Sequence, residues 1–207
     1  MHILKYELLP EAELLSRLKK TRLRGFDRAE VYRDATLELA RLHTDTLTPA
    51  QRYVLRDGVQ TILDIAEAFT LHGVDVFALR GALRFWIEGT DEPIPFLPPV
   101  VEESREPDGR TVLLINDGIH RVYAARKLGR EIDVVLARNV PAEYPYYAYA
   151  LPEGWPQVEE LAELTEGYQK KAYRNPDNYK ALFRDFNEIF EGVQKQRPRT
   201  NPSHLRA

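Results

Sequence analysis

The sequence predicts an α+β fold, in which a small mixed β-sheet follows a helical N-terminal region and is closed by a C-terminal amphipathic helix. Apolar residues recur at helical spacing through most of residues 1–90. Two strand-like runs then flank a turn at residues 107–109, and residues 176–193 carry one clean apolar helix face. The predicted units are a helical region over 1–90, an α+β domain with its closing helix over 91–194, and a basic, flexible tail over 195–207.

The composition excludes several classes of function. The chain has 207 residues, 43% of them hydrophobic, which is enough for a substantial core. It contains no cysteine, so disulfides, thiolate metal sites and cysteine nucleophiles are excluded. The five histidines are far apart and show no metal-ligand spacing, so the chain is predicted to hold no metal ion by itself. The formal net charge of −3 provides no general attraction for nucleic acid.

The N-terminus and the hydropathy pattern bear on location. Residues 1–10 lack the basic and then apolar pattern of a signal peptide. No apolar run approaches the length of a membrane span. A cytoplasmic protein without a membrane partner is therefore predicted, and the sequence predicts no particular oligomeric state.

The first half is predicted to form four helices. The first, over 11–23, has three leucines at helical spacing, and the second spans 27–42. Thr48 followed by proline predicts the start of a third helix, which runs to about Gly73. A fourth is predicted over 76–87.

The second half changes in character. Four prolines predict an extended connection over 91–99. Strands are predicted over 100–103 and 111–115, and a short helix over 120–128. A buried strand is predicted over 132–137 from its apolar, β-branched content. The remaining predicted elements are a Tyr- and Pro-rich loop over 141–156, a short helix over 158–164 and the closing helix over 176–193.

The stretch from 113 to 129 carries the predicted chemistry. A strand leads through a tight turn into a helix start, where unpaired N–H groups and the helix dipole favour an anion. Gly118 permits close approach of a ligand to the backbone, while His120 and Arg121 add donors. Asn116 and Asp117 either cap the helix, or Asp117 faces a metal ion or a hydroxyl. Arg121 is unfavourable at a helix N-terminus unless an anion offsets its charge.

An architectural interpretation of the same residues stays open. An Asp-Gly pair before a helix is often only a turn with a cap, and His120 can serve as a structural histidine. The tyrosines between 144 and 149 raise a similar choice, between stacking on a base and pinning a loop to the core.

The string Asn-Asp-Gly-Ile-His-Arg-Val-Tyr-Ala-Ala-Arg-Lys-Leu-Gly, beginning at residue 116, resembles the signature of the ParB/sulfiredoxin-like nucleotide-binding superfamily. The resemblance covers about residues 95–139 and implies a sheet of the ParB/sulfiredoxin type. It implies phosphate or nucleotide contacts by the stretch 116–121, and it matches Asp117 to an acidic, catalytic position in the family's small-molecule kinases. The residues implied to bind are Asn116, Gly118, Ile119, His120 and Arg121.

The chain also departs from that family. Ile119 stands where sulfiredoxin has its cysteine, which excludes sulfiredoxin chemistry. The predicted helices precede the sheet, unlike the plan of ParB-type partition proteins. The second acidic residue of the kinases has no clear counterpart here, although Glu102 and Glu103 are candidates.

The resulting hypothesis is a nucleotide-binding protein, either a small-molecule kinase or an ATPase. Its cofactor would be ATP, ADP or CTP with Mg²⁺, and its partner a small-molecule acceptor. The alternative is a non-catalytic nucleotide-gated or DNA-associated module, with DNA disfavoured by the net charge. A basic cluster supplies candidate additional contacts, which are Lys170, Lys171 and Arg174.

Overall fold

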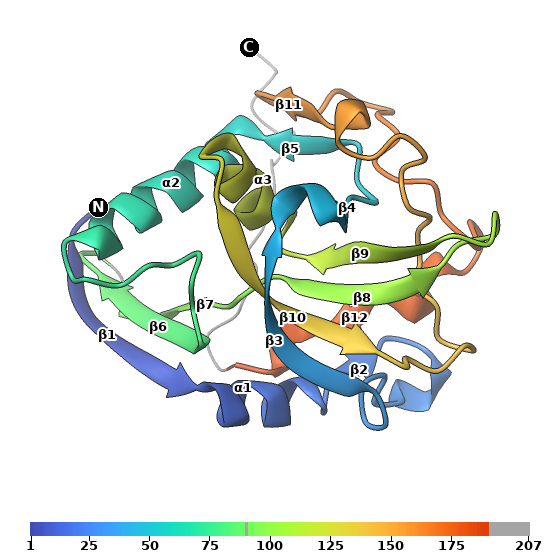
Figure 1. Cartoon of the computed structure of the whole chain (residues 1–207), viewed down its shortest axis with the longest axis horizontal. Helices are drawn as coiled ribbons and strands as arrows, with labels where there is room; N and C mark the ends of the chain where they lie inside the picture. Colours follow the sequence, from blue (N-terminus) through green and yellow to red (C-terminus); the bar gives the residue numbers. More distant parts are fainter. Residues whose placement is uncertain (90, 191–207) are drawn as a thin grey trace, which may run out of the picture.

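The computed structural model describes residues 1–89 and 91–190, and Figure 1 shows two main sheets with helices packed around them. The α-helices are α1 (Glu11–Leu18), α2 (Arg56–Thr70) and α3 (Ile119–Lys127). The strands are β1 (Ile3–Pro10), β2 (Arg22–Leu23), β3 (Thr36–His43), β4 (Leu47–Thr48), β5 (Tyr53–Leu55), β6 (Gly81–Ile87), β7 (Ile94–Phe96), β8 (Val100–Arg105), β9 (Thr111–Asp117), β10 (Glu131–Arg138), β11 (Glu159–Leu161) and β12 (Arg184–Asp185).

The larger sheet has the strand order β3-β10-β8-β9-β4. Strands β8 and β9 form the predicted antiparallel hairpin, with Val101 opposite Ile115. β10 lies between β3 and β8, antiparallel to β3 and parallel to β8. Its residues from Ile132 to Ala137 are all buried, as expected for a strand with neighbours on both edges and cover on both faces. The predicted strand over 132–137 is confirmed.

Helix α3 connects β9 to β10 and is the predicted helix over 120–128. Its buried residues include Val122 and Ala125, whose small side chains allow α3 to pack closely against α2. The strand, turn and helix start around Gly118 are therefore confirmed as local structure.

The smaller sheet has the order β1-β6-β7, and α2 packs on it. Phe69 of α2 meets Phe85 of β6 edge-to-face, with ring centroids 5.2 Å apart. The same buried cluster includes Val101, Ile115 and Leu136 of the larger sheet, so the core is shared by strands from both halves of the chain.

The prediction of a helical region over 1–90 is wrong. α1 and α2 lie within predicted helices, although α2 begins at Arg56 rather than after Thr48. The predicted helix over 27–42 is instead irregular as far as residue 35 and then forms the strand β3, and the one over 76–87 contains the strand β6. Both segments form strands because they pair with strands that are distant in the sequence: β3 pairs with β10, and β6 pairs with β1. Local apolar spacing does not reveal such partners.

Two predicted C-terminal helices are also corrected. Within 158–164 the chain forms β11, which pairs with β5. The described part of 176–193 forms two short 3-10 turns around the strand β12, not an amphipathic helix. Leu182, Ile189 and Phe190 are buried along this irregular path, and so is Arg184 of β12, which pairs with β2. Residues 191–193 and the predicted tail lie outside the described residues.

None of the helices in the described part of the chain combines the length and apolar character needed to cross a membrane.

Candidate functional site

The candidate site is a cleft of about 1860 Å³ at the starts of α2 and α3. The whole predicted loop 116–121 lines it, together with Lys170 and Lys171 from a segment far along the chain. Arg174, which was predicted with these lysines, does not line it. Residues 183–187 and Arg24 also line it. The fold thus brings two of the three predicted basic residues to the predicted loop.

The start of α3 is shaped by Gly118. This residue is the helix N-cap and has φ +87°, a left-handed conformation that favours glycine. The Val122 N–H donates to the Gly118 carbonyl at 3.0 Å, the first helical bond, so the preceding N–H groups point out of the helix start as in any α-helix. Neither Asn116 nor Asp117 is the N-cap residue.

The Arg121 guanidinium lies directly over Gly118. A Cβ added to Gly118 would come within 2.8 Å of Arg121 Nε. Arg121 donates to the Asp117 carboxylate and to the Leu97 carbonyl, and both charged side chains are mostly buried. Asp117 therefore offsets the unfavourable position of Arg121. The expectation that a bound anion is needed for this purpose is not supported.

His120 joins the starts of the two helices. Its Nε2 accepts a hydrogen bond from the Leu55 N–H at 3.0 Å, immediately before α2. In the neutral ring the proton therefore lies on Nδ1. The ring also rests on Gly58, where an added Cβ would lie 2.7 Å from its Cδ2 atom. His120 has a clear architectural role in addition to its place in the cleft.

Gly58→Ala tests this packing. Glycine to alanine inside a helix normally stabilises by about 0.5–1 kcal/mol. Here the new methyl group would press on the His120 ring, so we expect a loss of about 1–3 kcal/mol in the free energy of unfolding, measured by urea denaturation. In a His120→Ala background the same change should be neutral or stabilising. If Gly58→Ala stabilised the otherwise unchanged protein, the packing of the His120 ring on Gly58 would be contradicted.

A hydrogen-bonded chain links the loop to Lys171. Tyr146 donates from its hydroxyl to the Asn116 carbonyl at 3.2 Å. Lys171 Nζ lies 2.8 Å from the Tyr146 hydroxyl and 2.5 Å from that of Tyr147. Burial raises the pKa of Tyr146 well above its usual value, so its hydroxyl stays protonated. Asn116 Oδ1 is buried and has no hydrogen-bond partner in the described structure. These contacts hold Lys171 at the cleft wall.

Behind the cleft lies a buried ion pair that sequence reasoning missed. Arg184 donates to both carboxylate oxygens of Glu102, at 3.0 and 3.1 Å, and both side chains are almost fully buried. Tyr32 donates to Glu102 at 2.6 Å, and Asn116 Nδ2 donates to the Tyr32 hydroxyl at 3.2 Å. Glu102, a candidate base, is thus fully engaged. The only sequence feature that could have indicated a buried Arg184 is its position within an apolar run.

Burial and charge set the protonation of this network. Burial, and then the charge of Glu102, raise the pKa of Tyr32 well above its usual value. Burial acts to lower the pKa of Arg184, but Glu102 and Tyr32 together act in the opposite direction, and that pKa is raised. The network therefore contains one protonated phenol and one matched ion pair.

Arg174 is an anchor rather than a lining residue. It donates to the buried Glu106 at 2.6 Å, and its guanidinium lies 4.5 Å from the centre of the Tyr149 ring. The Tyr149 N–H donates to the Ala172 carbonyl at 2.9 Å. Arg174 thus fixes the segment that carries Lys170 and Lys171.

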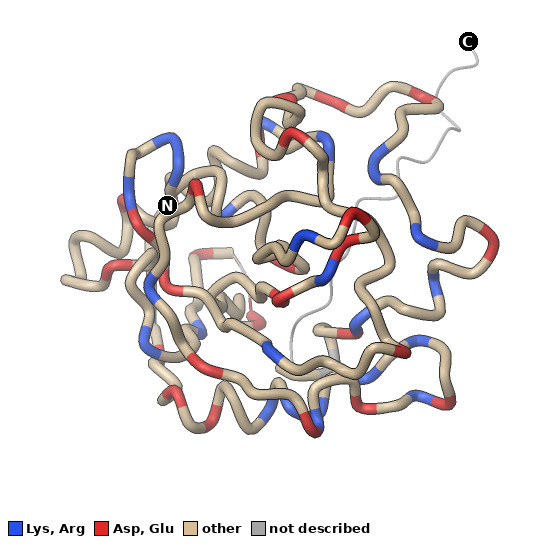
Figure 2. Tube along the Cα trace, turned by 45° about the vertical axis from the view of Figure 1, so that its right-hand side comes forward, with Lys and Arg blue, Asp and Glu red and all other residues tan. Residues whose placement is uncertain are grey.

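The cleft is locally positive although the chain is not. Its lining includes five Lys or Arg residues but only two Asp residues, in a chain with a formal net charge of −3. Figure 2 shows Lys and Arg positions intermixed with Asp and Glu positions along the described trace. The lining of the cleft is therefore more positive than the chain as a whole.

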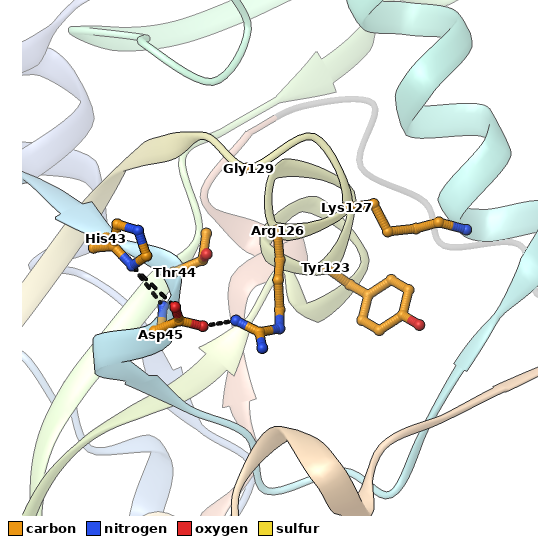
Figure 3. A pocket seen from close by; sticks show the side chains of 7 residues that line it. All are labelled: His43, Thr44, Asp45, Tyr123, Arg126, Lys127 and Gly129. Carbon is orange, nitrogen blue, oxygen red and sulfur yellow. Dashed lines mark hydrogen bonds and ion pairs between the residues drawn. The ribbon is translucent and has the colours of Figure 1, made fainter.

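A second, smaller pocket of about 330 Å³ is lined by the later residues of α3 and by residues 43–45 (Figure 3). Arg126 points across it and pairs with Asp45, which also contacts His43. Lys127 pairs with Glu160 at 2.9 Å. Since these cations have carboxylate partners at an open surface, this pocket is the weaker candidate for an anion. The described residues contain no group of three or more His, Cys, Asp or Glu side chains placed to hold a metal ion.

Comparison with known families gives one clear result. The family model described as the ParB CE domain matches residues 13–159, which is most of the chain. The match includes the loop 116–121 but ends before Lys170 and Arg184. A comparison with curated proteins finds no match.

Proposed function

This chain belongs to the ParB CE domain family, and on that premise we propose that it binds the phosphates of a nucleotide in the cleft at the start of α3. The observation that most supports the proposal is the lining of the cleft. An outward-pointing helix start with a glycine N-cap faces cations from separate segments, in a chain of negative net charge. Such a combination favours a multiply charged anion.

The loop would hold the first phosphate. Gly118 and Ile119 provide backbone N–H groups at the helix start, beside the Arg121 guanidinium. Arg121 has five N–H donors, of which its bonds to Asp117 and Leu97 use two, so the others are available for phosphate oxygens. Asp117 then serves to orient the guanidinium. Asn116 Oδ1, buried and unpaired, would accept a hydrogen bond from a ligand hydroxyl or amine.

The far wall would hold the outer phosphates. Lys171 is held by two phenols, so it can meet a phosphate with little further ordering. Lys170 precedes Lys171 on the same segment. The Lys170 carbonyl accepts a hydrogen bond from the Arg52 N–H at 3.1 Å, which holds this segment in place. A triphosphate such as CTP or ATP would engage both walls, and ADP fewer of these groups. Mg²⁺ would enter with the nucleotide, held mainly by its phosphates.

We favour binding without turnover. Asp117 is engaged by Arg121, and Glu102 by Arg184 and Tyr32, so neither carboxylate is poised as a base. A catalytic role for Asp117 in a kinase or an ATPase stays a prediction. Prolonged incubation with ATP or CTP and Mg²⁺ tests it: steady phosphate release that is lost in Asp117→Asn would assign turnover to this residue.

Titration calorimetry with CTP, ATP and ADP, with and without Mg²⁺, tests the binding proposal. Loss of one charge-assisted phosphate contact is worth about 1.5–3 kcal/mol, so Lys171→Gln should weaken triphosphate binding at least about tenfold. Lys180→Gln removes the same charge from an exposed residue that does not line the cleft, and should leave affinity unchanged. Absence of heat with every nucleotide, or equal effects of the two variants, would overturn the proposal.

A further inference from the structure

Strand β1 forms one edge of the three-stranded sheet. Its inner edge pairs with β6, with Tyr6 opposite Phe85, and among the described residues no strand pairs with its outer edge. Figure 1 shows β1 as the outermost strand on that side of the molecule. An eight-residue strand with one unpaired edge is a template for pairing with another chain.

Two leucines of β1 and one at the end of α2 are exposed. Leu4 and Leu8 are each 58% exposed, although both lie on a strand of the sheet. Leu71, at the end of α2, is 87% exposed. It precedes His72, whose ring lies 5.5 Å from the ring of Tyr6. Exposed apolar residues are usually scattered, and a group of them marks an interaction surface.

The charged residues of β1 point to a second copy of the same strand as the pairing partner. The sequence from residue 4 to residue 8 is Leu-Lys-Tyr-Glu-Leu, which has a charge pattern that complements its own reverse. If two such strands run antiparallel about a twofold axis at Tyr6, Lys5 of each copy faces Glu7 of the other, and Leu4 faces Leu8. Both charges are exposed within one copy, where they form a pair 2.7 Å long. Opposite charges directly across a strand pair are stabilising.

We propose that β1 pairs antiparallel with β1 of a second copy of this chain, joining the two three-stranded sheets into one across a twofold axis. The register irregularity falls at Leu4, and a proline stands at residue 10, so the pairing is confined to about residues 4–8 with Leu4 at its margin. The contact is isologous, so it closes at a dimer and does not propagate into fibres. β1 precedes the matched residues 13–159, and the inference does not depend on nucleotide binding.

Sedimentation velocity over a wide range of protein concentration tests the dimer. Wild type should dimerise reversibly. Lys5→Glu places two carboxylates opposite each other across the strand pair, and Glu7→Lys places two ammonium groups there, so each variant should dimerise at least about tenfold more weakly. An equimolar mixture of the two variants restores opposite charges across both pairs and should recover the dimer, as should the double exchange Lys5→Glu/Glu7→Lys in one chain.

Lys20→Glu is the matched control, since it makes the same change in net charge as Lys5→Glu at an exposed position outside β1. It should dimerise like wild type. Circular dichroism establishes that each variant is folded. A wild type that stays monomeric at submillimolar concentration would overturn the proposal, as would a mixture of Lys5→Glu and Glu7→Lys that behaves like the separate variants.

The absence of cysteine allows a test of register. A mixture of Leu4→Cys and Leu8→Cys proteins should form a disulfide-linked dimer under mild oxidation faster than either protein alone, because residue 4 faces residue 8 of the other copy. Equal rates for the mixture and the separate proteins would contradict this register.

Discussion

Replacement of Arg184 by methionine is expected to lower the free energy of unfolding by about 3–5 kcal/mol, because it leaves the Glu102 carboxylate buried without its partner. Arg184 also donates to the carbonyls of Leu182, Tyr144 and Pro145. It therefore ties residues 183–187, which line the cleft, to the loop at residues 144–145 and to strand β8. Urea denaturation followed by circular dichroism measures the loss.

Two further variants separate charge from packing. Glu102→Gln in the Arg184→Met background removes the uncompensated charge and still leaves an acceptor for the Tyr32 hydroxyl, so the double variant should be more stable than Arg184→Met alone. Arg138 also contacts two carboxylates, Glu38 and Glu103, but at an exposed surface. Arg138→Met should change stability by about 1 kcal/mol or less. Equal losses for Arg184→Met and Arg138→Met would contradict the account.

Gly118→Ala is expected to have the largest effect on nucleotide binding. The new Cβ would meet the Arg121 guanidinium within about 3 Å and would also require alanine to adopt φ +87°. Displacing Arg121 and obstructing the helix start removes more than one charge-assisted contact, so affinity should fall about a hundredfold or more. The strained backbone should also lower stability by about 1–3 kcal/mol. Calorimetry and denaturation measure the two effects separately.

Gly109→Ala is the control for backbone strain. Gly109 lies in the turn of the β8–β9 hairpin with φ +85°, almost the same angle, but no atom would lie within 4 Å of an added Cβ. This variant should lose about 1 kcal/mol of stability and keep its nucleotide affinity. If Gly109→Ala weakened binding as much as Gly118→Ala, the loss would reflect general destabilisation and not the site.

Local sequence signals predicted the part of the fold around the cleft. The turn glycine at 109, the β-branched run in β10 and the glycine before α3 all act through their immediate neighbours, and each element formed where it was expected. The strands β3 and β6 were missed because their partners, β10 and β1, are far away in the sequence. Their apolar residues are compatible with a helix until that pairing is known.

The candidate site also contains features that local sequence predicted and features that it did not. The loop 116–121 was predicted from one continuous stretch, and the structure places it in a cleft with Lys170 and Lys171. The pairing of Arg121 with Asp117 was not predicted, because the sequence does not show how an arginine at a helix start will turn. The pair between Glu102 and Arg184 was missed for a different reason. Only the tertiary fold brings these two residues together and buries them.

The most direct test of the central claim is a crystal structure of the protein soaked with CTP or ATP and Mg²⁺. We expect phosphate oxygens within hydrogen-bond distance of the backbone N–H groups at the start of α3, with the Arg121 guanidinium and Lys171 Nζ contacting them. Nucleotide bound instead in the pocket between His43 and Arg126, or a cleft without nucleotide at a concentration that saturates the protein in solution, would contradict the account.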